Sequence, residues 1–180
     1  MSQERLAVKR ITLVAMLTSM ASVIKIIFQA TTTPGFRITF YELPLIIIGG
    51  LFGPIMGGIA GFVTDVVYLV TFGYDLNLMT LSTMLWGIIS GLVIFKKNWK
   101  IKRIVMVIII ASILEFFING TMILIWNYAG SWRDAFYTIL PQQPIRILIL
   151  FLKWPVQILL IKILYDRVVK EFNINTKELE

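Results

Sequence analysis

Residues 43–65 read LPLIIIGGLFGPIMGGIAGFVTD, two apolar runs separated by Gly53-Pro54. Because Gly followed by Pro favours a tight turn, we expect a helix on each side of this dipeptide. Gly57 and Gly61 are four residues apart, and small residues at this spacing let neighbouring helices approach closely. The stretch therefore predicts two helices joined by a short turn, the second with a small-residue face for internal packing.

The composition of the whole chain indicates that these helices lie in a membrane. Of the 180 residues, 58% are apolar and 15% are charged, and the mean hydropathy is +0.84. Soluble domains are about 45–50% apolar and about 25% charged. We therefore expect an all-α integral membrane protein that forms a single domain over residues 1–180.

Six segments approach the roughly 20 apolar residues that a membrane-spanning helix needs. They are residues 11–30, 38–52, 55–73, 76–95, 104–128 and 144–165. The second is the shortest, and it fits either a tilted span or a re-entrant segment. The first is long for a cleavable signal peptide, so we expect it to be retained.

The basic residues predict how the six spans are oriented. Three groups contain 12 of the 17 Lys and Arg residues: Arg5, Lys9 and Arg10; Lys96, Lys97, Lys100, Lys102 and Arg103; and Lys162, Arg167, Lys170 and Lys177. With six spans, all three groups lie on the same side of the membrane. Lys and Arg are enriched in cytoplasmic loops, so both termini are expected to be cytoplasmic.

The composition also excludes most catalytic functions. The chain contains no Cys and no His, which removes disulfides, thiolate nucleophiles, imidazole bases and the usual zinc or haem ligands. No Gly-x-x-x-x-Gly-Lys-Ser/Thr loop for phosphate binding is present. We therefore expect neither an enzyme nor a bound metal or cofactor, with a membrane scaffold that transports nothing as an alternative.

Ionisable residues within the spans indicate a polar pocket. Such residues are costly in lipid and usually face a cavity or a partner. Most are predicted to lie in the outer half of the membrane: Lys25, Glu42, Asp65, Glu115, Arg146 and Lys153. Lys25 could instead extend to the outer interface. Arg146 and Lys153 share a helix face and could form internal ion pairs with Asp65 or Glu115.

Aromatic rings and amides accompany these charges, and together they suit a ring-shaped ligand with polar edges. The candidate binding residues are Arg37, Glu42, Tyr68, Asn77, Trp86, Asn119, Trp126, Arg146 and Lys153. Part of this set could instead belong to an aromatic belt at the membrane interface.

The glycine pattern carries a resemblance to a known family. Leu43-Pro44 followed by Gly49, Gly53-Pro54, Gly57, Gly61 and Asp65 resembles the substrate-binding S components of energy-coupling factor (ECF) vitamin transporters. The resemblance implies a six-helix, high-affinity vitamin-binding subunit of an ABC-type importer in a prokaryotic cytoplasmic membrane. It further implies a transmembrane coupling subunit (EcfT-type) and two ATPase subunits (EcfA-type) as partners.

The first span offers a docking surface for such a partner. Ala15, Ser19 and Ser22 are small residues on one helix face, a pattern that permits either internal packing or close contact with another subunit. Ala15-x-x-x-Ser19 stands where the family has an Ala-x-x-x-Ala motif that contacts the coupling subunit. The resemblance therefore favours docking.

The segment 34–40, PGFRITF, resembles the folate-type branch of the family. Folate carries two carboxylates, which Arg37, Arg146 and Lys153 could receive through charge-assisted hydrogen bonds. A small heterocycle such as hydroxymethylpyrimidine or pyridoxine would instead suit Glu42, Asp65 and the aromatic residues. Pantothenate and riboflavin are further alternatives.

The predicted topology can be tested by labelling, because the natural chain contains no cysteine. A thiol introduced by Thr32→Cys should react with an impermeant maleimide added outside intact cells, whereas one introduced by Asn98→Cys should react only after lysis. Labelling of both positions in intact cells would contradict the six-span topology.

Overall fold

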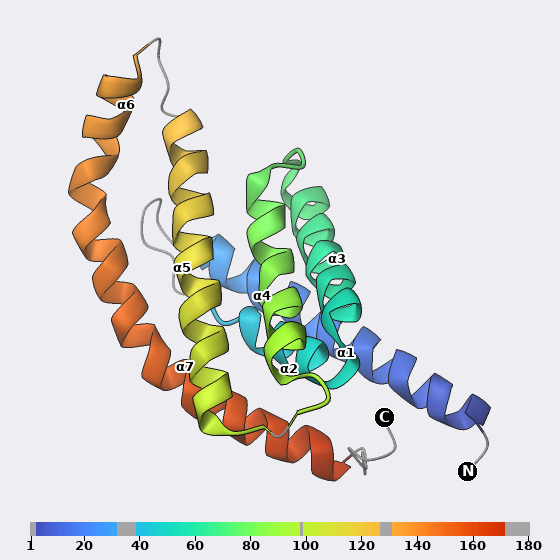
Figure 1. Ribbon diagram of the computed structural model, residues 1–180. Helices are drawn as coiled ribbons and strands as arrows, with labels where there is room; N and C mark the ends of the chain where they lie inside the picture. Colours follow the sequence, from blue (N-terminus) through green and yellow to red (C-terminus); the bar gives the residue numbers. More distant parts are fainter. Residues whose placement is uncertain (1–2, 32–38, 98, 127–130, 172–180) are drawn as a thin grey trace.

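The computed structural model describes residues 3–31, 39–97, 99–126 and 131–171, which contain helices and no strand (Figure 1). This confirms the all-α prediction for the described residues. The elements are α1 (Gln3–Thr31), α2 (Glu42–Phe52), α3 (Pro54–Phe72), α4 (Leu78–Ile94), α5 (Ile101–Trp126), α6 (Trp132–Ile139), a 3₁₀ helix η1 (Leu140–Gln142) and α7 (Gln143–Glu171).

Six of these helices correspond to the six expected segments, and α6 with η1 is an addition. No span was expected between residues 128 and 144, but most of residues 131–143 are helical. The second expected segment is also shorter than predicted, since α2 has 11 residues and a length of about 16 Å. All its residues from Glu42 to Leu51 are buried, so α2 lies inside the bundle and does not cross a bilayer by itself.

Local sequence signals explain where the central helices begin and end. Gly53 adopts φ +95°, a conformation that favours glycine, and Pro54 follows at the first turn of α3. Gly73 ends α3 in the left-handed conformation with φ +70°. The side chain of Asn77 accepts a hydrogen bond from the backbone N–H of Met79 and so caps α4.

Glycines bring the backbones of α2, α3 and α4 into direct contact. A Cβ atom on Gly87 of α4 would collide with the backbone of Gly57 in α3, and one on Gly49 of α2 would collide with the carbonyl oxygen of Gly87. A Cβ on Gly61 would lie 2.7 Å from the carbonyl oxygen of Thr83. Gly57 and Gly61 thus form an internal packing face, as predicted.

Several helices have the length and polarity of membrane spans. Val8–Phe28 in α1, the whole of α3, and the helical segment Trp132–Val168 are each long and apolar enough to cross a bilayer, while α4 is a shorter apolar helix. The beginning of α1, the α4–α5 connection and the end of α7 lie at one end of the molecule, at the bottom of Figure 1. The α3–α4 connection and α6 lie at the opposite end.

The glycine contact predicts a large effect of one methyl group. Gly87→Ala should lower the free energy of unfolding by about 1–3 kcal/mol or more, because the new Cβ meets backbone atoms that cannot rotate away. Unfolding of the detergent-solubilised protein by SDS measures this change. Gly120→Ala is the control, since its Cβ would lie 3.8 Å from the nearest atom outside its own helix. Equal unfolding midpoints for the two variants would contradict the prediction.

Candidate functional site

A cavity of about 1050 Å³ lies beside the α3–α4 connection, whose residues from Tyr74 to Asn77 help to line it. Its wall is formed by residues of α1, α3, α4, α5 and α7, together with Thr39 and Tyr41 just before α2. Charged side chains of both signs line it: Lys25, Asp65, Asp75, Glu115, Arg146 and Lys153. The cavity therefore gathers most of the ionisable residues that the sequence places within the spans.

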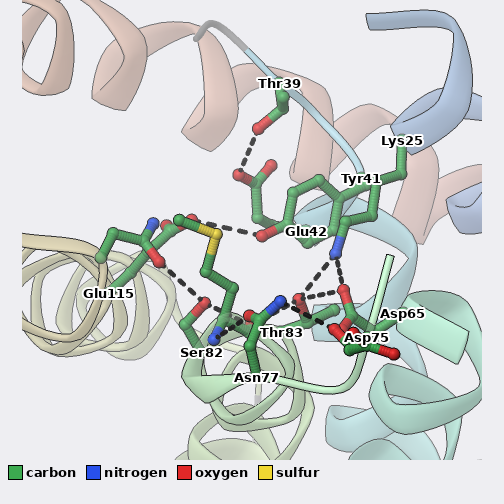
Figure 2. A network of polar contacts seen from close by, with 12 residues as sticks. Lys25, Thr39, Tyr41, Glu42, Asp65, Asp75, Asn77, Ser82, Thr83 and Glu115 are labelled. Atoms are coloured by element: carbon green, nitrogen blue, oxygen red, sulfur yellow. Dashed lines mark hydrogen bonds and ion pairs between the residues drawn. The ribbon is translucent and has the colours of Figure 1, made fainter. Parts of the chain in front are cut away.

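Lys25 of α1 and Asp65 of α3 form a buried ion pair in this wall (Figure 2). The ammonium group of Lys25 also donates a hydrogen bond to Thr83 of α4 at 2.8 Å and lies 4.7 Å from the ring centroid of Tyr41. Lys25 is only 6% exposed, so the interpretation that it extends to the membrane interface is wrong. The pair connects α1 to the α3–α4 core.

A second ion pair connects α7 to α2. The ammonium group of Lys153 lies 2.5 Å from Oε1 of Glu42, and the hydroxyl of Thr39 donates to the same oxygen at 3.0 Å. Lys153 therefore pairs with Glu42 and not with Asp65 or Glu115. Glu42 is fully buried and does not line the cavity, and its carboxylate holds Lys153, which does.

Glu115 of α5 lines the cavity with its carboxylate fixed from two sides. The hydroxyl of Tyr41 donates to Oε1 at 3.2 Å, and the indole N–H of Trp86 donates to Oε2 at 3.1 Å. Trp86 is 0% exposed and is absent from the cavity wall. Trp86, a candidate binding residue, thus lies behind the wall, where its indole N–H holds the carboxylate of Glu115.

Other candidate residues lie in the wall itself. Asn119 accepts a hydrogen bond from Ser82 at 3.3 Å. Tyr68 lines the cavity beside Phe72, with ring centroids 5.0 Å apart. Asn77 also lines it, although its side chain is engaged in capping α4.

Arg146 occupies the α7 side of the cavity. Its guanidinium carbon lies 4.8 Å from the ring centroid of Phe116, within the range of a cation–π contact, and its Nη1 donates to Gln143 at 3.4 Å. Arg37 lies outside the described residues, as does the side chain of Trp126.

Several wall residues stand outside the predicted binding set, among them Lys25, Tyr41 and Glu115. Lys25 and Glu115 carried a signal, because an ionisable residue within an apolar span indicates a functional site, and both were used to predict a polar pocket from the sequence. Tyr41 carries no comparable signal, since a tyrosine near a helix end is common at membrane interfaces.

The small residues of α1 divide into two groups. Ala15 and Ser19 are exposed on the surface of the bundle. Ser22 is buried and donates a hydrogen bond to the backbone oxygen of Thr18 at 3.0 Å. Only Ala15 and Ser19 remain accessible to a partner.

Comparison with known proteins connects the cavity to a family. Residues 9–165 match the family described as "ECF transporter, substrate-specific component". The chain belongs to this family. It is consequently a component of a membrane transporter. Its family is one of transport components and not of enzymes, as the resemblance implied.

Two similar proteins are named for one vitamin. The "Folate transporter FolT" of Clostridium novyi (strain NT) is 33% identical over 101 residues, an alignment covering 55% of this chain and 57% of that relative. The match thus spans little more than half of the relative's length. A solved structure described as "Crystal structure of FolT bound with folic acid" superposes with a TM-score of 0.67 at 25% identity, covering 83% of this chain and 87% of the other.

The ion pair in the cavity wall predicts a strong coupling between two residues. Lys25→Met leaves a buried carboxylate unpaired and should cost about 3–5 kcal/mol of unfolding free energy, as should Asp65→Leu. The double variant should recover most of this loss, because neither charge remains. SDS unfolding of the wild type, the two single variants and the double variant measures these losses. Additive losses in the double variant would contradict the ion pair between Lys25 and Asp65.

Proposed function

We propose that the chain binds a folate in the cavity and presents it to an ECF-type importer as the substrate-specific subunit. The observation that carries this proposal is the cavity itself, which combines acidic groups, amides and aromatic rings with an arginine on the α7 side. The likeness to proteins named for folate supports the same ligand.

The size of the cavity favours folate over the smaller vitamins. Small-molecule pockets measure about 300–1,000 Å³ and cover most of a drug-sized ligand. At about 1050 Å³ the cavity accommodates an elongated molecule with two ring systems and a glutamate tail. Hydroxymethylpyrimidine or pyridoxine, each a single ring, would leave much of this volume to water.

The polar groups suit the two ends of a folate. The pterin ring carries N–H donors along one edge. Asp65 pairs with Lys25 through Oδ1 but accepts no hydrogen bond from the described residues at Oδ2, so that oxygen and the carboxylate of Glu115 offer acceptors for the ring. The glutamate end carries carboxylates, for which the guanidinium of Arg146 is a suitable partner. Lys153 is already paired with Glu42, so it contributes less to a ligand than Arg146.

Arg146→Ala should weaken binding of folic acid about 10- to 100-fold, because a hydrogen bond to a charged group contributes about 1.5–3 kcal/mol. Isothermal titration calorimetry of the purified protein measures the dissociation constant. Arg133→Ala is the matched control, since Arg133 is an exposed cation of α6 outside the cavity wall.

The same titration distinguishes the vitamins. Saturable heat with pyridoxine or hydroxymethylpyrimidine, and none with folic acid, would overturn the folate assignment. In that case Asn119→Ala should affect binding more than Arg146→Ala does.

The proposed setting is the prokaryotic cytoplasmic membrane, with both termini on the cytoplasmic side. The described parts of the three basic groups lie near the beginning of α1, in the α4–α5 connection and near the end of α7, which gather at one end of the molecule (Figure 1). This arrangement supports the orientation that the charge pattern predicts. ATP hydrolysis is assigned to the two EcfA-type partners, and α1 to contact with the EcfT-type subunit.

Ala15→Trp and Ser19→Trp should each abolish co-purification with the coupling subunit, because an indole prevents the close helix approach that small exposed residues permit. Binding of folic acid to the isolated variants should persist. Leu159→Trp, on the exposed apolar face of α7, is the control and should leave the complex intact. A complex that survives both α1 substitutions would rule out docking at this face.

A further inference from the structure

The short helix α6 has three distinct faces. At 100° per residue, Ala135 and Ile139 share one face, and both are buried on the side of α5. The adjacent face carries Trp132 and Phe136, which are 56% and 52% exposed, and is followed by Leu140 at the start of η1, which is 48% exposed. The remaining face is exposed and polar, and is formed by Arg133, Asp134 and Tyr137.

Exposed apolar side chains continue below α6 along α7. Residues 132–168 form an apolar helical segment of 37 residues, in which Leu148, Leu152 and Leu159 of α7 are each more than half exposed. Such exposed leucines on a membrane-spanning helix face lipid tails. Trp132, Phe136 and Leu140 thus lie at the end of a segment whose exposed apolar side chains face lipid.

The position of α6 at the end of the bundle places it at the edge of the hydrocarbon layer. The contour of residues 132–168 is about 55 Å at 1.5 Å per residue, which exceeds the roughly 30 Å of the hydrocarbon core even though the C-terminal part of α7 runs sideways at the bottom of Figure 1. The 19 residues of α3 extend about 28 Å and match that thickness. Figure 1 shows α6 projecting past the ends of α3 and α4.

We propose that α6 lies in the headgroup region of the bilayer. In this position Trp132, Phe136 and Leu140 contact the acyl chains just below the headgroups, while Arg133 faces the lipid phosphates and Asp134 faces water. Helices with one apolar and one polar exposed face bind at this boundary, and Trp and Tyr are enriched there. The lipid surface is therefore a binding partner of α6.

This contact bears on the cavity, because Gln142 and Arg146 follow α6 directly and line it. A helix held by the lipid surface fixes where these two side chains enter the cavity wall. The contact is independent of which ligand the cavity takes, so it can be tested without folate.

Single cysteines in this Cys-free chain allow a spin label to report the surroundings of each face. The variants are Phe136→Cys on the apolar face, Asp134→Cys on the polar face and Leu152→Cys as a control within the membrane. Each is labelled with a nitroxide and reconstituted into liposomes of phosphatidylcholine and phosphatidylglycerol. Collision rates with oxygen and with the polar reagent NiEDDA are then measured.

The label at Phe136→Cys should collide mainly with oxygen and report a depth of about 5–10 Å below the headgroups, while the label at Asp134→Cys collides mainly with NiEDDA. Equal access of NiEDDA to both labels would mean that α6 lies in water, which overturns the proposal. Protection of the Phe136→Cys label from both reagents would mean that protein covers the face, which also overturns it. Leu140→Cys provides a second variant if Phe136→Cys does not fold.

Discussion

Direct backbone contact between α3 and α4 is the constraint on which the rest of the structure depends. Gly57 and Gly87 touch without side chains between them, and Gly49 brings α2 against the same point. In a membrane the apolar tails of lipids compete with apolar side chains, so helices associate through close packing and internal hydrogen bonds. This close approach places Asp65 beside Thr83. It also keeps Glu115 within hydrogen-bonding distance of Tyr41 and Trp86.

Two buried ion pairs attach outer helices to this core. Lys25 joins α1 to α3, and Lys153 joins α7 to α2. Buried pairs contribute little net stability compared with apolar residues of similar size, but they specify one arrangement, because any other arrangement leaves a charge unpaired. In this chain the arrangement so specified is a cavity wall, with Lys25, Asp65 and Lys153 all lining it.

Much of the fold follows from the sequence, because glycine spacing, apolar length and ionisable residues within spans each reflect a local physical requirement. The depth of a side chain relative to a cavity cannot be predicted in this way, because it depends on how the helices pack. Glu42 and Trp86 have the chemistry of ligand contacts, yet both stand one layer behind the wall, where they hold Lys153 and Glu115. The sequence analysis also misses α6, because its eight residues, followed closely by Pro141, resemble a loop by length and composition.

In the proposed complex with a coupling subunit, helix α1 links the docking surface to the cavity. Ala15 and Ser19 lie on the surface of its middle part, while Lys25 stands in the cavity wall only ten residues, or about 15 Å, beyond Ala15 on the same helix. Any tilt of α1 that a neighbouring subunit imposes also moves the ammonium group of Lys25. Reciprocity then requires that a cavity ligand alter the affinity of that subunit by the same factor by which the subunit alters the affinity of the ligand. Binding of the ligand and binding of the subunit are thus linked by the same coupling free energy.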